Sequence, residues 1–236
     1  MRYTLAVDAG STGTRLHVVR WEPRTPPLLP LVLETGPAST KKVTPGLSSF
    51  AAAPSRAGDS LMPLLAFAQA SVPFEARNAT PIVLFGTAGV RMLHSAVQEA
   101  IYTSALHTCE RSGFRIDRSS FRTLSGEDEG YYGWLALALL AQHTPEASHV
   151  LGGLDLGGGS TQLSFVDMQV SGVLGTSTGL HRARERAFSR SHLGFGNRAA
   201  LARVEAALRA PSDSRHERAQ PCFFRGYSYA GTDGAR

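Results

Sequence analysis

The chain has 236 residues, and 42% of them are hydrophobic, which is enough to bury a sizeable core in one large or two small domains. Its formal net charge of +5 comes almost wholly from arginines scattered along the chain, whereas a nucleic-acid-binding protein gathers its basic residues in one patch. The composition therefore does not favour nucleic acid as a partner. Two cysteines are too few for a disulfide framework, and no apolar run reaches the roughly 18 residues of a membrane-spanning helix.

The first half begins with short apolar runs that predict β-strands over residues 3–7, 14–21 and 28–33. A glycine-rich turn and a proline-rich turn separate these runs, which favours an antiparallel start to a sheet. Because the first strand begins almost at the amino terminus, no signal peptide is expected ahead of the fold. The pattern then predicts helices over 59–70, 94–111 and 127–142 and a buried strand over 81–85. The segment over 115–124 is ambiguous between helix and strand.

The second half repeats the opening pattern. A strand over 150–156, a turn of three glycines and a strand over 162–166 follow one another as they do at the start of the chain. After these, the sequence predicts a further strand over 170–174 and a helix over 197–210. The end, over 211–236, is predicted to be rich in loops. We therefore expect an α/β fold in two lobes, a first lobe over 1–142 and a partial second lobe over 143–236, each with one glycine turn.

Two glycine-rich turns, Asp8–Thr14 and Asp155–Thr161, match one another. In each, an aspartate ends an apolar strand, a glycine follows two residues later, and small hydroxyl residues close the turn. Glycines let backbone amides approach phosphate oxygens without a side chain in the way. The candidate phosphate-binding residues are Ser11, Thr12, Gly13, Thr14, Arg15, Gly157, Gly158, Gly159, Ser160 and Thr161. For either turn alone, the alternative is an ordinary tight hairpin.

Asp8 and Asp155 suggest a metal ion. A carboxylate at the end of an apolar strand is costly unless it is paired or faces a cation. We expect Mg²⁺ or Ca²⁺ to lie between the two aspartates and the phosphates, held mostly through water, because phosphoryl transfer requires charge neutralisation. The alternative is that each aspartate caps its own turn through backbone amides.

Two further segments contain candidate reactive groups. Glu129 opens a predicted helix and is the candidate general base for water, although carboxylates at such positions usually only interact with the helix dipole. Thr87 and Arg91 follow a strand end rich in small residues, where both are candidates to bind phosphate. The chain has no Walker lysine and no Gly-x-Ser-x-Gly motif, which speaks against a P-loop ATPase or a serine hydrolase.

Four segments in order, Asp8–Arg15, Thr87–Arg91, Gly126–Trp134 and Asp155–Gln162, resemble the four apyrase conserved regions of the nucleoside triphosphate diphosphohydrolase family. The resemblance implies an actin-like, ribonuclease-H-type fold of two lobes. Family members continue well past the point equivalent to Arg236, so the resemblance also implies that the second lobe is incomplete in this chain.

The resemblance further implies an activity, which is hydrolysis of the terminal phosphate of nucleoside di- or triphosphates such as GDP, UDP and ATP. It assigns phosphate binding to Ser11 and Ser160 and activation of water to Glu129. The hydrated cation would be organised by Asp8, Asp155, Thr87 and Gln162. The glycine patterns look more like the Golgi and secreted nucleoside diphosphatase branch, which implies a Golgi, secreted or membrane-anchored protein.

Three alternatives remain open at this stage. An exopolyphosphatase of the same superfold would have similar phosphate loops, and a sugar or acetate kinase would transfer the phosphate to an acceptor instead of water. A nucleotide-binding fragment without turnover is the alternative outside the enzymes. The substrate in every enzymatic case contains a phosphoric anhydride or a phosphoryl group, which is the chemistry that the two glycine turns predict.

Overall fold

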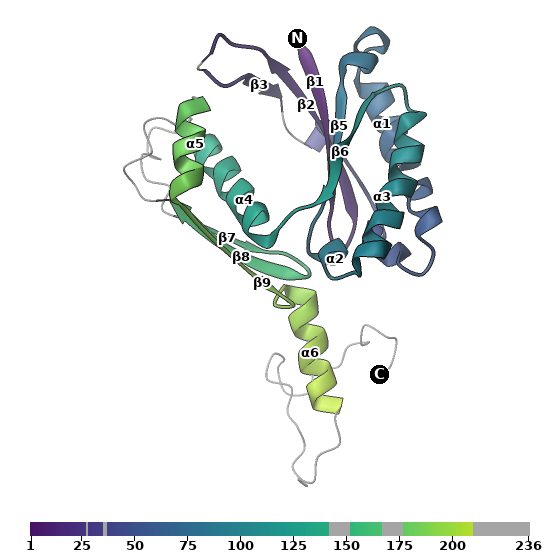
Figure 1. Ribbon diagram of the computed structural model, residues 1–236, viewed down its shortest axis with the longest axis vertical. Helices are drawn as coiled ribbons and strands as arrows, with labels where there is room; N and C mark the ends of the chain where they lie inside the picture. Colours follow the sequence, from purple (N-terminus) through teal and green to yellow (C-terminus); the bar gives the residue numbers. More distant parts are fainter. Residues whose placement is uncertain (27, 35–36, 142–151, 167–176, 210–236) are drawn as a thin grey trace.

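Two β-sheets, one from each half of the chain, form the frame of the protein (Figure 1). The computed structural model describes residues 1–26, 28–34, 37–141, 152–166 and 177–209. Within these ranges the first sheet has six strands and the second has three. None of the helices in the same ranges combines the length and apolar character that crossing a membrane requires.

The first sheet joins an antiparallel hairpin to parallel strands. β1 (Arg2–Ala9) pairs antiparallel with β2 (Thr14–Glu22), and β2 also pairs with β3 (Leu31–Glu34) and β4 (Thr40–Val43). On the other side of β1 lie β5 (Pro81–Gly86) and then β6 (Arg115–Thr123), both parallel to it. The antiparallel start is thus confirmed, and the ambiguous segment is a strand. β3 begins later than expected, after Pro30, which has no amide hydrogen for strand pairing.

Helices α1 (Met62–Ser71) and α3 (Ser95–Glu110) cover one face of this sheet (Figure 1). Successive side chains of a strand point to opposite faces, so alternate residues of β1, β2 and β5 form the core beneath the helices. These are Leu5, Val7, Leu16, Ile82 and Leu84, all of them buried. The same alternation places Asp8 on the opposite face of β1, away from the two helices.

Short helical turns connect these elements. They are α2 (Ala88–Arg91) and the 3₁₀ turns Pro37–Ser39, Leu47–Phe50, Pro54–Arg56, Asp59–Leu61 and Phe74–Ala79. The predicted helix over 59–70 corresponds to the 3₁₀ turn Asp59–Leu61 together with α1. The predicted helix over 94–111 corresponds to α3. Their apolar spacing was therefore a sufficient signal.

The second sheet is an antiparallel meander of β7 (Gly153–Leu156), β8 (Ser160–Val166) and β9 (Ala187–Leu193). Three helices accompany it, α4 (Gly126–Ala141), α5 (Ser177–Arg186) and α6 (Asn197–Arg209). The sequence pattern missed α5 and β9. β9 turns serines toward α4, so it lacks the apolar alternation of a half-buried strand. The predicted strand over 170–174 and the loop-rich end over 211–236 lie outside the described residues.

Helix α4 packs against all three strands of the second sheet. Its Tyr131, Trp134 and Ala138 form a small core with Val166 of β8 and Ala183 of α5. Packing therefore groups α4 with the second sheet, although the division of the sequence at residue 142 placed it in the first lobe. The division itself remains a prediction, because residues 142–151 lie outside the described ranges.

Candidate active site

The first glycine turn, Gly10–Gly13, joins β1 to β2 and is held from behind by two other glycines. A Cβ atom on Gly46 would lie 2.3 Å from the carbonyl oxygen of Gly10, and one on Gly89 would lie 2.7 Å from Cα of Ser11. Backbone therefore packs directly against backbone here, which only glycine allows. The turn is fixed by tertiary contacts as well as by its own sequence.

The second glycine turn, Gly157–Gly159, is held by the start of α6. The carbonyl oxygens of Gly157 and Gly158 accept hydrogen bonds from the amides of Asn197 (2.9 Å) and Arg198 (3.1 Å). The carbonyl oxygen of Gly159 accepts one from the amide of Gly194 at 2.8 Å. Since the C=O and N–H of a trans peptide point in opposite directions, the amides of Gly158 and Gly159 point away from α6, and the amide of Ser160 points away from the loop before that helix. This is the orientation that a phosphate-binding loop needs.

The two turns meet at the base of one cleft. A Cβ atom on Gly158 would lie 2.5 Å from Oγ of Ser11, and one on Gly159 would lie 3.0 Å from Cβ of Ala88. The cleft has a volume of about 410 Å³. Its lining includes the predicted residues Asp8, Ser11, Thr12, Gly13, Arg15, Thr87, Glu129, Asp155, Gly157, Gly158, Gly159 and Ser160.

Asp8 and Asp155 line this cleft from opposite sheets, Asp8 at the end of β1 and Asp155 in β7. Burial raises the pKa of the Asp8 carboxyl, nearby Arg15 and Lys42 lower it, and the negative charge of Asp155 raises it. The repulsion shows that the two carboxylates are close enough to sense one another. Both carboxylates would favour a positive charge in this cleft.

Glu129 reaches the cleft because α4 approaches the second sheet closely. Cβ atoms on Gly126 and Gly130, one turn apart on α4, would lie 2.2 Å from Cβ of Ser191 and 2.5 Å from Oγ of Ser164. The two glycines thus bring the first turn of α4 onto β8 and β9. This position buries Glu129 partly, leaving its side chain 18% exposed.

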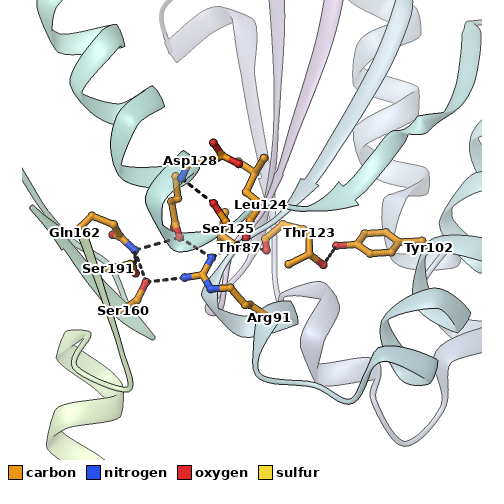
Figure 2. Close-up of polar contacts among 12 residues, drawn as sticks. Thr87, Arg91, Tyr102, Thr123, Leu124, Ser125, Asp128, Ser160, Gln162 and Ser191 are labelled. Carbon is orange, nitrogen blue, oxygen red and sulfur yellow. Dashed lines mark hydrogen bonds and ion pairs between the residues drawn. The ribbon is translucent and has the colours of Figure 1, made fainter. Parts of the chain in front are cut away.

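The carboxylate of Glu129 is held by two donors, Arg91 and Gln162, which are labelled in Figure 2. Arg91 Nη1 and Gln162 Nε2 both donate to its Oε2, at 3.0 and 3.1 Å. Burial raises the pKa of Glu129, Arg91 opposes this shift, and the charges of Asp155 and Asp8 add to it. Glu129 is thus an oriented carboxylate with an elevated pKa, as a general base requires.

Four predicted residues do not line the cleft in this structure. The side chain of Thr14 is fully buried, and Thr161 Oγ1 donates to the carbonyl oxygen of Phe195 at 2.7 Å. Arg91 and Gln162 lie behind Glu129, in contact with its carboxylate. The predicted roles of all four toward phosphate and cation stay predictions.

Lys42 is a cleft residue that the sequence pattern did not single out. It belongs to β4, where it pairs with Arg15 of β2, and both side chains line the cleft. Its Cε would lie 2.7 Å from a Cβ atom on Gly13, so the lysine lies across the first glycine turn. Two adjacent lysines in a four-residue strand give no local signal for this site, and only the pairing of β4 with β2 brings Lys42 there.

Residues 1–233 match the model of the GDA1/CD39 (nucleoside phosphatase) family. The chain belongs to this family. Among its GDA1/CD39-type relatives, ectonucleoside triphosphate diphosphohydrolase 5 of Gallus gallus is 32% identical over 87% of this chain. Nucleoside-diphosphatase uda-1 of Caenorhabditis elegans is 38% identical over 69% of this chain. The aligned part is 49% of the first relative and 36% of the second, so the chain spans about half or less of their length.

A solved structure shows the same architecture. Nucleoside triphosphate hydrolase from Neospora caninum matches with a TM-score of 0.55 at 18% identity, over 91% of this chain and 48% of that one. At this identity the likeness concerns the fold, and it confirms the actin-like fold expected from the four motifs.

Proposed function

We propose that this protein hydrolyses the terminal phosphoric anhydride bond of nucleoside di- or triphosphates of the GDP, UDP and ATP class. The observation that supports the proposal most directly is the cleft itself. Two glycine turns, two aspartates and the held carboxylate of Glu129 all line the same volume. Names of the relatives point the same way, since one is a nucleoside-diphosphatase and another a nucleoside triphosphate diphosphohydrolase.

A divalent cation, Mg²⁺ or Ca²⁺, fits the donors around the cleft. A cation near Asp8 and Asp155 would relieve the repulsion between them. Oε1 of Gln162 is buried and has no hydrogen-bond partner among the described residues, so it is an acceptor that suits the water shell of an ion. We assign the cation to Asp8, Asp155, Thr87 and Gln162, mostly through water. Bound there, it would neutralise the negative charge of the phosphates.

In the proposed reaction, the carboxylate of Glu129 accepts a proton from water. The hydroxide oxygen attacks the terminal phosphorus, and the bond between that phosphorus and the bridging oxygen breaks. The bridging oxygen keeps the electron pair and leaves as the shortened nucleotide, and the proton passes from Glu129 to solvent. Backbone amides of the glycine turns and the hydroxyls of Ser11 and Ser160 would hold the phosphate oxygens.

Phosphate release from GDP, UDP and ATP with Mg²⁺ or Ca²⁺ tests the proposal. Glu129→Gln is expected to lower kcat by about 10²- to 10⁴-fold, because an amide cannot accept the proton. Glu127→Gln is the matched control, since Glu127 is an exposed carboxylate two residues earlier in the same helix turn. Unchanged kcat in Glu129→Gln would exclude Glu129 as the base.

The same assay separates the alternatives. Faster release from inorganic polyphosphate than from GDP would indicate an exopolyphosphatase, and phosphate transfer to a sugar or acetate would indicate a kinase. Calorimetric binding of GDP without phosphate release would indicate a nucleotide-binding chain. Any of these three results would replace the proposed activity.

A further inference from the structure

Arg91 lies between the part of the site on the first sheet and the part formed by α4 and the second sheet. It ends α2 on the side of the first sheet, and its guanidinium reaches α4 and β8 (Figure 2). Nη1 donates to the carbonyl oxygen of Leu124 and to Oε2 of Glu129, both at 3.0 Å. Nη2 donates to Oγ of Ser160 at 3.4 Å. The side chain is 16% exposed, and it does not line the cleft.

These contacts use three of the five N–H hydrogens of the guanidinium, two on Nη1 and one on Nη2. A guanidinium nitrogen of the Nη type has two hydrogens, and both hydrogens of Nη1 are already donated. A direct phosphate contact by Nη1 would therefore require Arg91 to release Glu129 or Leu124. The observed arrangement favours a role toward Glu129 over the phosphate contact that the sequence pattern predicts.

Gln162 duplicates the donor pattern of Arg91. Its Nε2 lies 3.1 Å from Oε2 of Glu129, 2.6 Å from Oγ of Ser160 and 3.0 Å from Oγ of Ser191, so its two hydrogens are shared among three acceptors. Both donors thus converge on the same two atoms, one on the candidate base and one on a cleft-lining serine. Among the described residues, no hydrogen bond reaches the other carboxylate oxygen of Glu129, Oε1.

This convergence determines which atoms face the substrate. With Oε2 of Glu129 accepting two hydrogen bonds, Oε1 is the oxygen that remains for water. A hydroxyl oxygen has two acceptor positions and one donor hydrogen. Because Arg91 and Gln162 both donate to Oγ of Ser160, its own hydrogen is left to donate elsewhere, and Ser160 lines the cleft. Glu129 therefore presents Oε1 as an acceptor to water, and Ser160 presents its hydroxyl hydrogen as a donor to phosphate.

We propose that Arg91 is a positioning residue that holds Glu129 by Oε2 and Ser160 by Oγ, and that it does not bind the phosphate of the substrate. The inference rests on the proposed function, since it takes Glu129 as the base. It assigns to Arg91 an effect on the chemical step and none on nucleotide affinity.

The test compares Arg91→Met, Arg91→Lys and Arg118→Met. Arg118 pairs with Glu99 at 2.5 Å on the surface, with both side chains more than 60% exposed, so Arg118→Met removes an arginine–glutamate pair outside the site. For Arg91→Met we expect kcat with GDP to fall about 100-fold, as a misplaced base requires. The KM for GDP, and the Kd of a non-hydrolysable GDP analogue measured by calorimetry, should stay within about threefold of the parent values, since about tenfold marks a lost interaction of 1.4 kcal/mol. Arg118→Met should match the parent protein.

Arg91→Lys keeps one charged donor and is expected to recover about tenfold of the lost kcat, because a single ammonium replaces the fork only in part. The proposal is wrong if Arg91→Met raises KM and the analogue Kd tenfold or more while kcat is kept. Unchanged analogue binding also shows that a slow variant is folded.

A failure of the proposed function is distinguishable from a failure of this inference. If the parent protein releases no phosphate from any nucleotide, the proposed function fails. Crystal structures of the parent and of Arg91→Met then decide the inference alone. It predicts that the carboxylate of Glu129 leaves its position beside Gln162 in the variant, and an unmoved carboxylate would overturn it.

Discussion

The contact between Gly196 and the second glycine turn gives a sharp test of how the cleft is built. Gly196 precedes α6, and a Cβ atom there would lie 2.5 Å from three backbone atoms, the carbon of Gly158 and the nitrogens of Gly159 and Ser160. Ordinary contact begins at 3.4 Å. In Gly196→Ala the turn and α6 must therefore separate by about 0.9 Å, because backbone atoms cannot rotate away as a side chain can.

A displacement of this size should affect catalysis strongly. Misplacement of a reacting group by about 1 Å costs on the order of 100-fold in rate. We expect kcat for GDP to fall by about that factor in Gly196→Ala, with a loss of about 1 to 3 kcal/mol in the free energy of unfolding. Phosphate release and urea unfolding measure the two effects.

Gly133→Ala is the matched control for this substitution. Gly133 lies inside α4, and a Cβ atom there would have nothing within 4 Å. The added methyl should raise the free energy of unfolding by up to about 1 kcal/mol through helix propensity and leave kcat unchanged. If Gly196→Ala keeps the parent kcat, the turn does not depend on α6 and the reasoning is refuted.

Three further predictions concern the charges in the cleft. Because burial raises the pKa of Glu129 and the base must be ionised, kcat/KM should fall on acidification with a midpoint above the usual glutamate pKa; a midpoint at the usual value would contradict this. Lys42→Ala removes a cation at the cleft, so KM for GDP should rise about fivefold, which corresponds to about 1 kcal/mol for a charge pair in water, and an unchanged KM would separate Lys42 from the substrate. Chelation by EDTA should abolish phosphate release and excess Mg²⁺ or Ca²⁺ should restore it, whereas full activity in EDTA would remove the cation from the proposal.

In the described part of the chain, the outer face of the second sheet is apolar and exposed. Leu154, Leu156, Leu163, Phe165 and Phe188 lie on strands β7 to β9 and are 41% to 73% exposed. An antiparallel sheet usually packs its apolar face against another part of the protein and leaves only its polar face in water. Sequence periodicity could not show this, because an apolar alternation predicts a face to bury but not the element that buries it.

Much of the fold could be predicted because its signals are local. The apolar runs of β1, β5, α1 and α3 are short-range patterns that tertiary context did not override. β9 was missed for a physical reason: α4 approaches it through Gly126 and Gly130, and this close approach requires serines where a core strand usually has large apolar residues. The glycines and the serines are separated by about sixty positions in the printed sequence, so neither explains the other until the chain is folded.

By itself, the amino-acid sequence determined the two aspartate–glycine turns and the acidic helix start, because each is a contiguous run whose chemistry needs no partner to be recognised. Tertiary structure alone decided which atoms face the cleft. It brought Lys42 across the first turn through strand pairing, turned Arg91 onto Glu129 and buried Thr14. The physical reason is that a side chain's direction depends on packing between segments distant in sequence, whereas the identity of a turn depends only on its own residues.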